Sequence, residues 1–168
     1  MGKIKNTLFV LICLIAPMLA FGQEKDHSKK HEHENPEMKE PGLEIIVSGL
    51  IVYSPKHKIA DPANEVHLTY WTSHEWAFGI GYSMIFEEEG RIGHELTGII
   101  SHRPWEFLTV NVGPSFSLPN SHKDTEISAY LETEFAFDVG KIHMGPTIGS
   151  LIGEEYRLFG GWHISYEF

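Results

Sequence analysis

Apolar and polar residues alternate with a period of two through most of residues 43–168. The final segment is the clearest case, because every second residue is apolar or glycine: Tyr156, Leu158, Gly160, Trp162, Ile164, Tyr166 and Phe168. Residues 76–87 and 126–139 follow the same rule. Successive side chains of a β-strand point to opposite faces, so this alternation predicts strands with one apolar face and one polar face.

Turn-forming residues divide this periodic region into eight predicted strands. Their approximate ranges are 43–54, 64–73, 76–87, 92–102, 105–117, 125–138, 141–152 and 156–168. Tight turns are expected at His74-Glu75, Arg103-Pro104 and Val139-Gly140, and more polar connections at 55–63, 88–91 and 118–124. Pro114 and Pro146, each preceded by a glycine, are expected to mark bulges or kinks, because proline cannot donate a ladder hydrogen bond.

An even number of strands, each with an apolar face, is what a membrane β-barrel requires. Lipid cannot hydrogen-bond an open sheet edge, so the sheet must close on itself. The sequence therefore predicts an all-β fold, an eight-stranded antiparallel up-and-down transmembrane β-barrel. The alternative is a soluble lipocalin-like barrel or β-sandwich, whose apolar face would point inward. The apolar face is aromatic on nearly every predicted strand, which is more than one small core can bury.

The first 42 residues differ from the rest of the chain. Residues 1–22 combine Lys3 and Lys5 with an apolar run over 8–21, which is shorter than the roughly 20 residues of a membrane-spanning helix. This pattern predicts a cleaved secretory signal peptide, with cleavage before Gln23. Residues 23–42 contain no aromatic or β-branched residue, so we expect a disordered arm rich in histidine and glutamate. The barrel is expected to occupy residues 43–168.

Charge and cysteine content exclude several classes of function. The formal net charge of −10 opposes binding to nucleic acid, and the basic residues form no stripe along the sequence. No glycine-rich loop precedes a helical pattern, so no nucleotide site is expected. The only cysteine, Cys13, lies in the predicted signal peptide, which excludes intramolecular disulfides and cysteine-based zinc sites.

The chain ends in Trp162-His163-Ile164-Ser165-Tyr166-Glu167-Phe168. This ending resembles the C-terminal signal of Gram-negative outer-membrane β-barrel proteins, which closes with phenylalanine and has apolar residues at alternate positions before it. The whole chain is similar to small barrels of the eight-stranded class that follow a short arm. The resemblance implies export to the outer membrane, insertion by the barrel-assembly machinery and contact with outer-membrane lipid. It implies nothing about a ligand.

The polar face of the predicted strands would line the barrel interior. It contains Glu44, Glu65, His67, Glu87, Glu95, Arg103, Asn111, Glu126, Tyr130, Glu132, Glu134, Asp138, Lys141, His143, Arg157, His163 and Glu167. An eight-stranded barrel is just wide enough for its own side chains. We therefore expect a packed polar plug, in which carboxylates pair with arginine, lysine and histidine. Acids outnumber bases on this face, so neutrality would require protonated histidines or protonated carboxylates.

Two groups of residues are candidate metal ligands. The first is a lumenal metal or proton site made of His67, His143 and His163 with Glu132 or Glu134. Imidazole and carboxylate ligands suit zinc, copper or nickel. Alternation alone cannot place these side chains at one depth, so a polar plug without metal stays open. The second group is His27, His31 and His33 of the arm, for which a solvated histidine-rich linker is the alternative.

These patterns favour a non-enzymatic outer-membrane barrel with a plugged lumen. One alternative is a barrel hydrolase that acts on membrane lipid, similar to lipid A deacylases, because His163, Ser165 and Glu167 alternate on one strand. These three residues are expected to face the lumen, away from acyl chains of the outer leaflet. A narrow pore is the other alternative.

Overall fold

A computed structural model describes residues 42–119, 125–139 and 142–168. The predicted signal peptide and the predicted arm up to residue 41 lie outside these residues. The strands are β1 (Gly42–Ser54), β2 (Ile59–Trp71), β3 (Trp76–Phe86), β4 (Ile92–Trp105), β5 (Leu108–Ser117), β6 (Ile127–Phe135), β7 (Phe137–Val139), β8 (Ile142–Ile152) and β9 (Tyr156–Glu167). A 3-10 turn, η1 (Glu88–Gly90), joins β3 to β4. In the part of the chain described, no helix is long and apolar enough to cross a bilayer.

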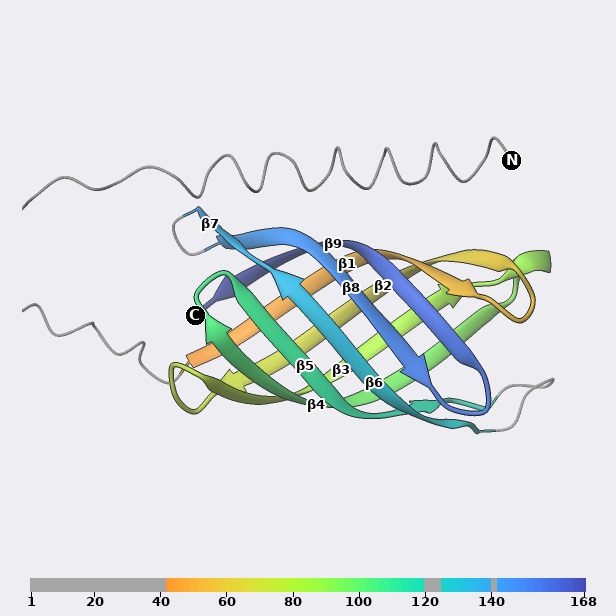
Figure 1. The fold of residues 1–168 in the computed structure, drawn as a ribbon, viewed down its shortest axis with the longest axis horizontal. Helices are drawn as coiled ribbons and strands as arrows, with labels where there is room; N and C mark the ends of the chain where they lie inside the picture. The colour runs from red at the N-terminus through yellow and green to blue at the C-terminus, as the bar shows by residue number, and fades with distance from the viewer. Residues whose placement is uncertain (1–41, 120–124, 140–141) are drawn as a thin grey trace, which may run out of the picture. The chain divides into compact units, whose positions relative to one another are not determined.

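The strands form one closed antiparallel barrel (Figure 1). Each strand pairs with its sequence neighbour, and β1 pairs with β9, so the first and last strands lie side by side. Pairing of β6 with β8 closes the sheet, and the short β7 continues β6 along the same partner. The barrel therefore has eight strand positions, which confirms the predicted eight-stranded antiparallel up-and-down barrel. We call the end with Gly42 and Phe168 the terminal end, and the opposite end the loop end.

Two predicted connections are wrong. The polar segment predicted over 55–63 is a turn of only four residues, because β2 begins at Ile59 and pairs with the end of β1. Pro62 is tolerated there because it lies one residue beyond the last β2–β3 pair, where its missing N–H breaks no ladder bond. The turn predicted at Arg103-Pro104 instead lies at 106–107, after a register shift between His102 and Trp105 in β4.

The two Gly-Pro pairs interrupt the strand pairing without shifting its register. Pairing between β4 and β5 stops opposite Gly113-Pro114 and resumes in the same register. Pairing of β6 and β7 with β8 does the same opposite Gly145-Pro146. Of the predicted bulges or kinks, a bulge is therefore absent at these prolines, and the register shift lies beside Pro104 instead. The missing N–H of each proline explains the gap, and the preceding glycine allows a backbone carbonyl to approach.

The barrel is polar inside and apolar outside. Among the described residues, 33 large hydrophobic side chains are exposed and 11 hydrophobic residues are buried. Buried polar and charged residues number 23. Alternation also holds in β1, where the sequence pattern was least regular: Glu44, Ile46, Ser48, Leu50 and Val52 point inward.

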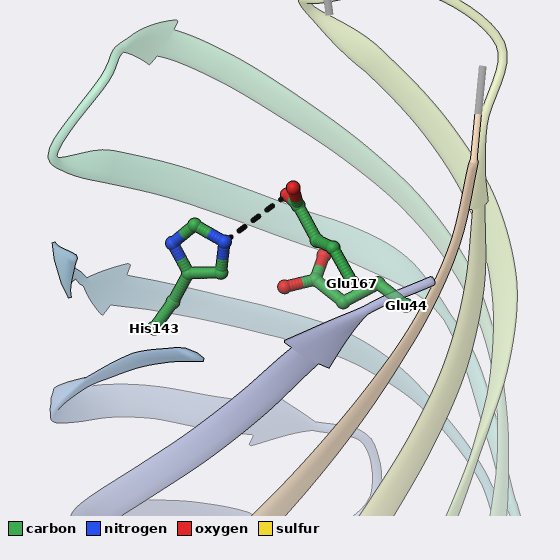
Figure 2. Close-up of side chains that lie close together, drawn as sticks. All are labelled: Glu44, His143 and Glu167. Atoms are coloured by element: carbon green, nitrogen blue, oxygen red, sulfur yellow. Dashed lines mark ion pairs between the residues drawn. The ribbon is translucent and has the colours of Figure 1, made fainter. Parts of the chain in front are cut away.

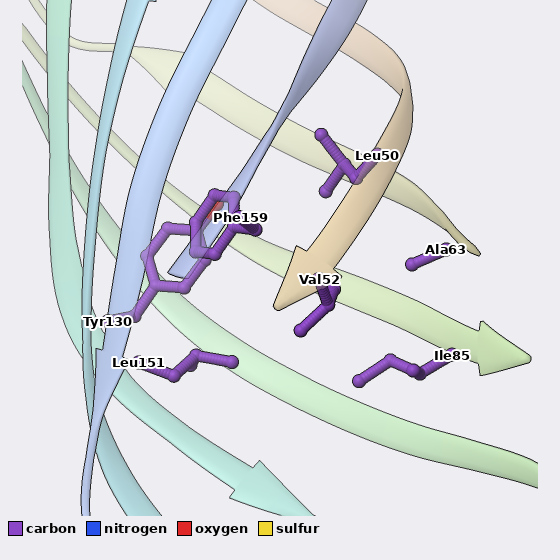
Figure 3. Packing of buried hydrophobic residues seen from close by; sticks show 7 residues of the cluster. All are labelled: Leu50, Val52, Ala63, Ile85, Tyr130, Leu151 and Phe159. Carbon is purple, nitrogen blue, oxygen red and sulfur yellow. The ribbon is translucent and has the colours of Figure 1, made fainter. Parts of the chain in front are cut away.

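The sequence predicted a uniformly polar interior, but the interior also has an apolar part. An apolar cluster lies toward the loop end and consists of Leu50, Val52, Ala63, Ile85, Tyr130, Leu151 and Phe159 (Figure 3). The rings of Tyr130 and Phe159 stack there at 5.4 Å between centroids. These residues share the inward face with the acids but lie nearer the loop end of their strands. Polar side chains predominate in the middle and at the terminal end of the lumen, and the loop end combines the apolar cluster with buried polar groups such as Glu95 and Arg157.

Candidate lumenal site

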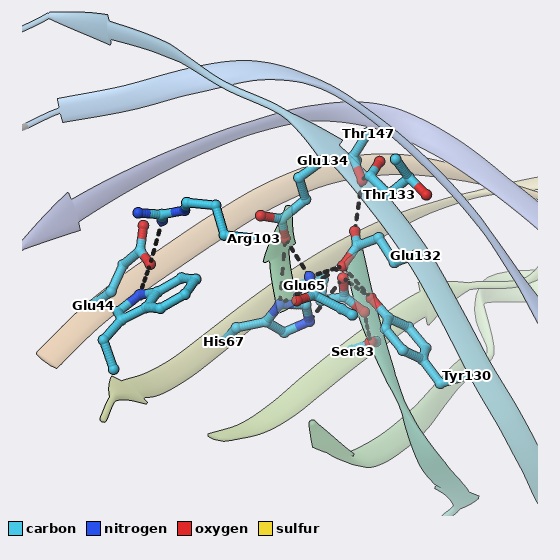
Figure 4. Close-up of polar contacts among 12 residues, drawn as sticks. Glu44, Glu65, His67, Ser83, Arg103, Tyr130, Glu132, Thr133, Glu134 and Thr147 are labelled. Atoms are coloured by element: carbon cyan, nitrogen blue, oxygen red, sulfur yellow. Dashed lines mark hydrogen bonds and ion pairs between the residues drawn. The ribbon is translucent and has the colours of Figure 1, made fainter. Parts of the chain in front are cut away.

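Four ionisable side chains meet in the middle of the lumen (Figure 4). Glu65 and His67 extend from β2, and Glu132 and Glu134 extend from β6; we call these four the central cluster. In both strands the residues are two apart, so alternation directs both side chains inward. Strands β2 and β6 are not neighbours in the sheet and therefore face each other across the lumen. All four residues are at most 5% exposed.

Neutral donors hold the three carboxylates in place. Ser83 Oγ donates to Glu65 Oε2 at 2.6 Å, and Thr147 Oγ1 donates to Glu132 Oε1 at 2.7 Å. Asn111 Nδ2 donates to Glu132 Oε2 at 2.9 Å and to Glu134 Oε1 at 2.8 Å. The hydroxyl of Tyr130 lies 2.7 Å from Glu132 Oε2 and 3.1 Å from Glu65 Oε1. The cluster is thus oriented by a continuous hydrogen-bonded shell.

His67 is the only basic group in contact with these carboxylates among the described residues. Its Nε2 lies 3.0 Å from Glu65 Oε1, and its Nδ1 lies 4.0 Å from both Glu132 Oε2 and Glu134 Oε1. Neither ring nitrogen has a hydrogen-bond partner in acceptable geometry. Three carboxylates therefore surround one imidazole, without an arginine or lysine to balance their charge.

A second cluster closes the terminal end. It contains Glu44, Trp71, Arg103, His143 and Glu167; we call it the terminal cluster. Trp71 Nε1 donates to Glu44 Oε2 at 2.6 Å, and the Arg103 guanidinium lies 3.9 Å from the centroid of the Trp71 ring. Figure 2 shows Glu44, His143 and Glu167 together, with His143 Nε2 at 3.3 Å from Glu167 Oε1. Arg103 lies 3.9 Å from Glu44 and 3.6 Å from Glu167, so its permanently charged guanidinium forms ion pairs with both carboxylates.

The loop end has its own ion pair and a recess. Arg157 NH2 lies 2.6 Å from Glu95 Oε1, and both side chains are buried. Beyond them a recess of about 290 Å³ opens between Ser54, His57, Glu87, Arg91 and Glu155, among other residues. His57 Nε2 is 3.3 Å from Glu155 Oε1 in this recess. No residue of the central cluster lines this recess.

The predicted lumenal metal ligands do not all lie in one cluster. His67, Glu132 and Glu134 come together, whereas His143 joins the terminal cluster. His163 is buried on β9, interacts electrostatically with His143 and His67, and has no hydrogen-bond partner at Nδ1. Glu65 was placed on the inward face by the sequence but not among the metal ligands. Its position two residues before His67 on the same strand is the signal that would have included it.

Other predicted residues lie at the edges of the interior or outside the description. Glu87 and Glu126 are only partly buried. Lys141 and the arm histidines His27, His31 and His33 lie outside the described residues, and the side chain of Asp138 is not described.

Comparisons with known proteins identify the fold but no family. No family model matches the chain, and no curated protein matches it. The N-terminal β-barrel domain of Pseudomonas aeruginosa OprF is similar in structure, with a TM-score of 0.62, 10% identity, and coverage of 77% of this chain and 98% of that chain. A de novo designed transmembrane β-barrel gives a TM-score of 0.53, 14% identity, and coverage of 78% and 99%. Neisserial surface protein A gives a TM-score of 0.48, 9% identity, and coverage of 76% and 97%.

Proposed function

We propose that the protein is a non-enzymatic outer-membrane β-barrel with a closed lumen, which anchors its N-terminal arm and its loops at the membrane. The observation that carries the proposal is the inverted distribution of side chains, with large hydrophobic residues outside and acids, histidines and arginines inside. In water, such a continuous apolar exterior would promote aggregation. In lipid, the same exterior is favourable, and closure leaves no unpaired sheet edge.

Strand lengths and aromatic residues support membrane residence. A transmembrane β-strand needs roughly 9–11 residues, and most barrel strands meet or exceed this length, from 9 residues in β6 to 14 in β4. Exposed aromatic residues lie at both ends of the barrel, as interfacial girdles do: Trp76, Trp105, Phe137 and Phe168 at the terminal end, and Tyr53, Phe86, Phe116 and Tyr156 at the loop end. The fold shared with the OprF barrel domain and the designed transmembrane barrel is consistent with this location.

The filled interior favours a closed barrel over a pore or a hydrolase. The central cluster, the terminal cluster and the apolar cluster occupy successive depths of the lumen. His163 and Ser165 are 1% and 3% exposed, so a lipid outside the barrel cannot reach the serine hydroxyl. The proposed contacts of the protein are therefore made by its loops and by the arm of residues 23–42, which includes His27, His31 and His33.

Membrane residence is tested by extraction and by gel mobility. We expect the full chain, produced with its N-terminal region in a Gram-negative host, to remain in the outer-membrane fraction until detergent is added. The unboiled protein should migrate differently from the boiled protein, because a closed barrel resists unfolding by SDS. A soluble periplasmic protein with one mobility would contradict the proposal.

A closed lumen also predicts that the barrel does not conduct ions. Purified barrel in a planar lipid bilayer should show no steady single-channel current, because three layers of side chains fill the interior. A porin inserted under the same conditions provides the positive control. Steady conductance from the folded, heat-modifiable protein would show that the lumen is open and would favour the pore instead.

A further inference from the structure

We propose that the central cluster binds one divalent transition-metal ion of the zinc class through His67, Glu65 and Glu132, with Glu134 beside them. One ligand atom from each of the first three residues can be chosen so that all three atoms lie within 4.8 Å of one another. This inference requires only the closed barrel and not its location in a membrane.

The spacing between the His67 and Glu65 ligand atoms suits a shared ion. Zinc lies roughly 2.0–2.2 Å from imidazole nitrogen and carboxylate oxygen, so two ligands of one ion stand about 3 to 3.5 Å apart. Nε2 of His67 and Oε1 of Glu65 are 3.0 Å apart, yet this contact lacks hydrogen-bond geometry. The N–H or lone pair of that nitrogen therefore points off the line joining the two atoms, as it does when both atoms bind a third one.

The charge of the cluster is the second line of argument. Burying a charge is costly unless a partner of opposite charge is present. The three carboxylates share only His67, and the arginines nearest the lumen are already paired: Arg103 with Glu44 and Glu167, and Arg157 with Glu95. A divalent cation would balance the excess negative charge at the place where it is concentrated.

The third observation is the state of His67 itself. The residue is 1% exposed, and both ring nitrogens face carboxylate oxygens while neither makes a hydrogen bond. Buried polar atoms usually make hydrogen bonds, so a buried imidazole whose two ring nitrogens face carboxylates without making one requires an explanation. Coordination of one ring nitrogen to a metal provides it.

The terminal cluster is a weaker candidate, although Glu44, His143 and Glu167 also meet the distance criterion. The Arg103 guanidinium lies within 4 Å of both carboxylates and would repel a second cation there. The central cluster has no such competitor among the described residues. An imidazole with two or three carboxylates favours zinc or a similar transition metal over calcium or magnesium, which take oxygen ligands.

The test is the metal content of the protein refolded with and without zinc. Because the site is buried, the full chain is unfolded in urea, refolded into detergent with Zn²⁺ or with EDTA, and then washed with EDTA. We expect about one tightly held Zn²⁺ per chain. Glu132→Gln and His67→Gln should each reduce retained zinc at least about tenfold. Both substitutions nearly preserve side-chain size, and heat-modifiable mobility reports whether each variant has folded.

Two variants serve as controls. His163→Gln removes another buried lumenal imidazole and should retain zinc as the wild type does. The triple variant His27→Ala, His31→Ala, His33→Ala should also retain it, which separates the lumen from the arm. If a cluster variant does not fold, X-ray absorption on the zinc-loaded wild type must show imidazole and oxygen ligands without sulfur. No retained zinc in the folded wild type, unchanged zinc in the folded cluster variants, or loss confined to the arm variant would overturn the proposal.

Discussion

Replacing Gly113 with alanine should strongly destabilise the barrel. A Cβ atom at Gly113 would lie 1.7 Å from the carbonyl oxygen of Gly98 and 2.8 Å from its carbonyl carbon. Both are backbone atoms of the neighbouring strand β4, so no side-chain rotation relieves the overlap. Either the two strands separate or the strand pairing fails. Overpacking typically costs about 1–3 kcal/mol, and we expect about 3 kcal/mol or more here because the obstacle is backbone.

The measurement is urea unfolding of the purified protein in detergent, followed by the shift in gel mobility. Gly49→Ala is the matched control, since a Cβ atom there meets nothing within 4 Å. Gly49 also lies in a barrel strand, so the two variants share the effect of alanine on the unfolded chain. Equal unfolding midpoints for the two variants would contradict the close approach of β4 to Gly113.

This glycine illustrates what the sequence could not predict. The alternation of residues predicted a barrel, its number of strands and its inward face, because side-chain direction depends only on position along a strand. The Gly-Pro pairs were visible in the sequence, but their effect depends on which backbone lies opposite. Opposite Pro114 the missing N–H falls within an otherwise continuous ladder, so the pairing stops without slipping. Pro62 lies just beyond the β2–β3 ladder, and its pairing with Ile51 of β1 continues without a break.

Depth within the lumen was the second unpredictable quantity. His67, His143 and His163 share the inward face, and nothing in the sequence separates them by depth. Strand tilt and register decide their depth: His67 lies opposite Ile46 on β1, whereas His163 lies opposite Ser48 and His143 pairs with Ser165. As a result, His67 lies near Glu132, whereas His143 lies near Glu167. The apolar cluster was missed for the same reason, since alternation does not separate the two ends of a strand.

Removing the guanidinium of Arg157 should also strongly reduce the stability of the barrel. In the wild type, Arg157 NH2 lies 2.6 Å from Glu95 Oε1. Arg157→Met preserves much of the side-chain volume but leaves the Glu95 carboxylate buried without a cation. Removing one partner of a buried ion pair costs about 3–5 kcal/mol. Both residues are under 10% exposed, so solvent screens the remaining charge only weakly. We expect a lower urea midpoint for Arg157→Met, and Glu95→Gln should also destabilise the barrel by leaving the arginine unpaired.

The double variant Arg157→Met, Glu95→Leu separates the cost of an orphaned charge from the value of the ion pair. Leu151 pairs with Arg157 across β8 and β9, and Phe159 follows on the same inward face, so apolar replacements would extend the apolar cluster. Replacing both members of a buried pair with apolar residues is often neutral or stabilising. We therefore expect the double variant to recover most of the stability lost in Arg157→Met. A double variant no more stable than Arg157→Met would mean that the loop end needs this ion pair itself, and that the apolar cluster cannot close the lumen without it.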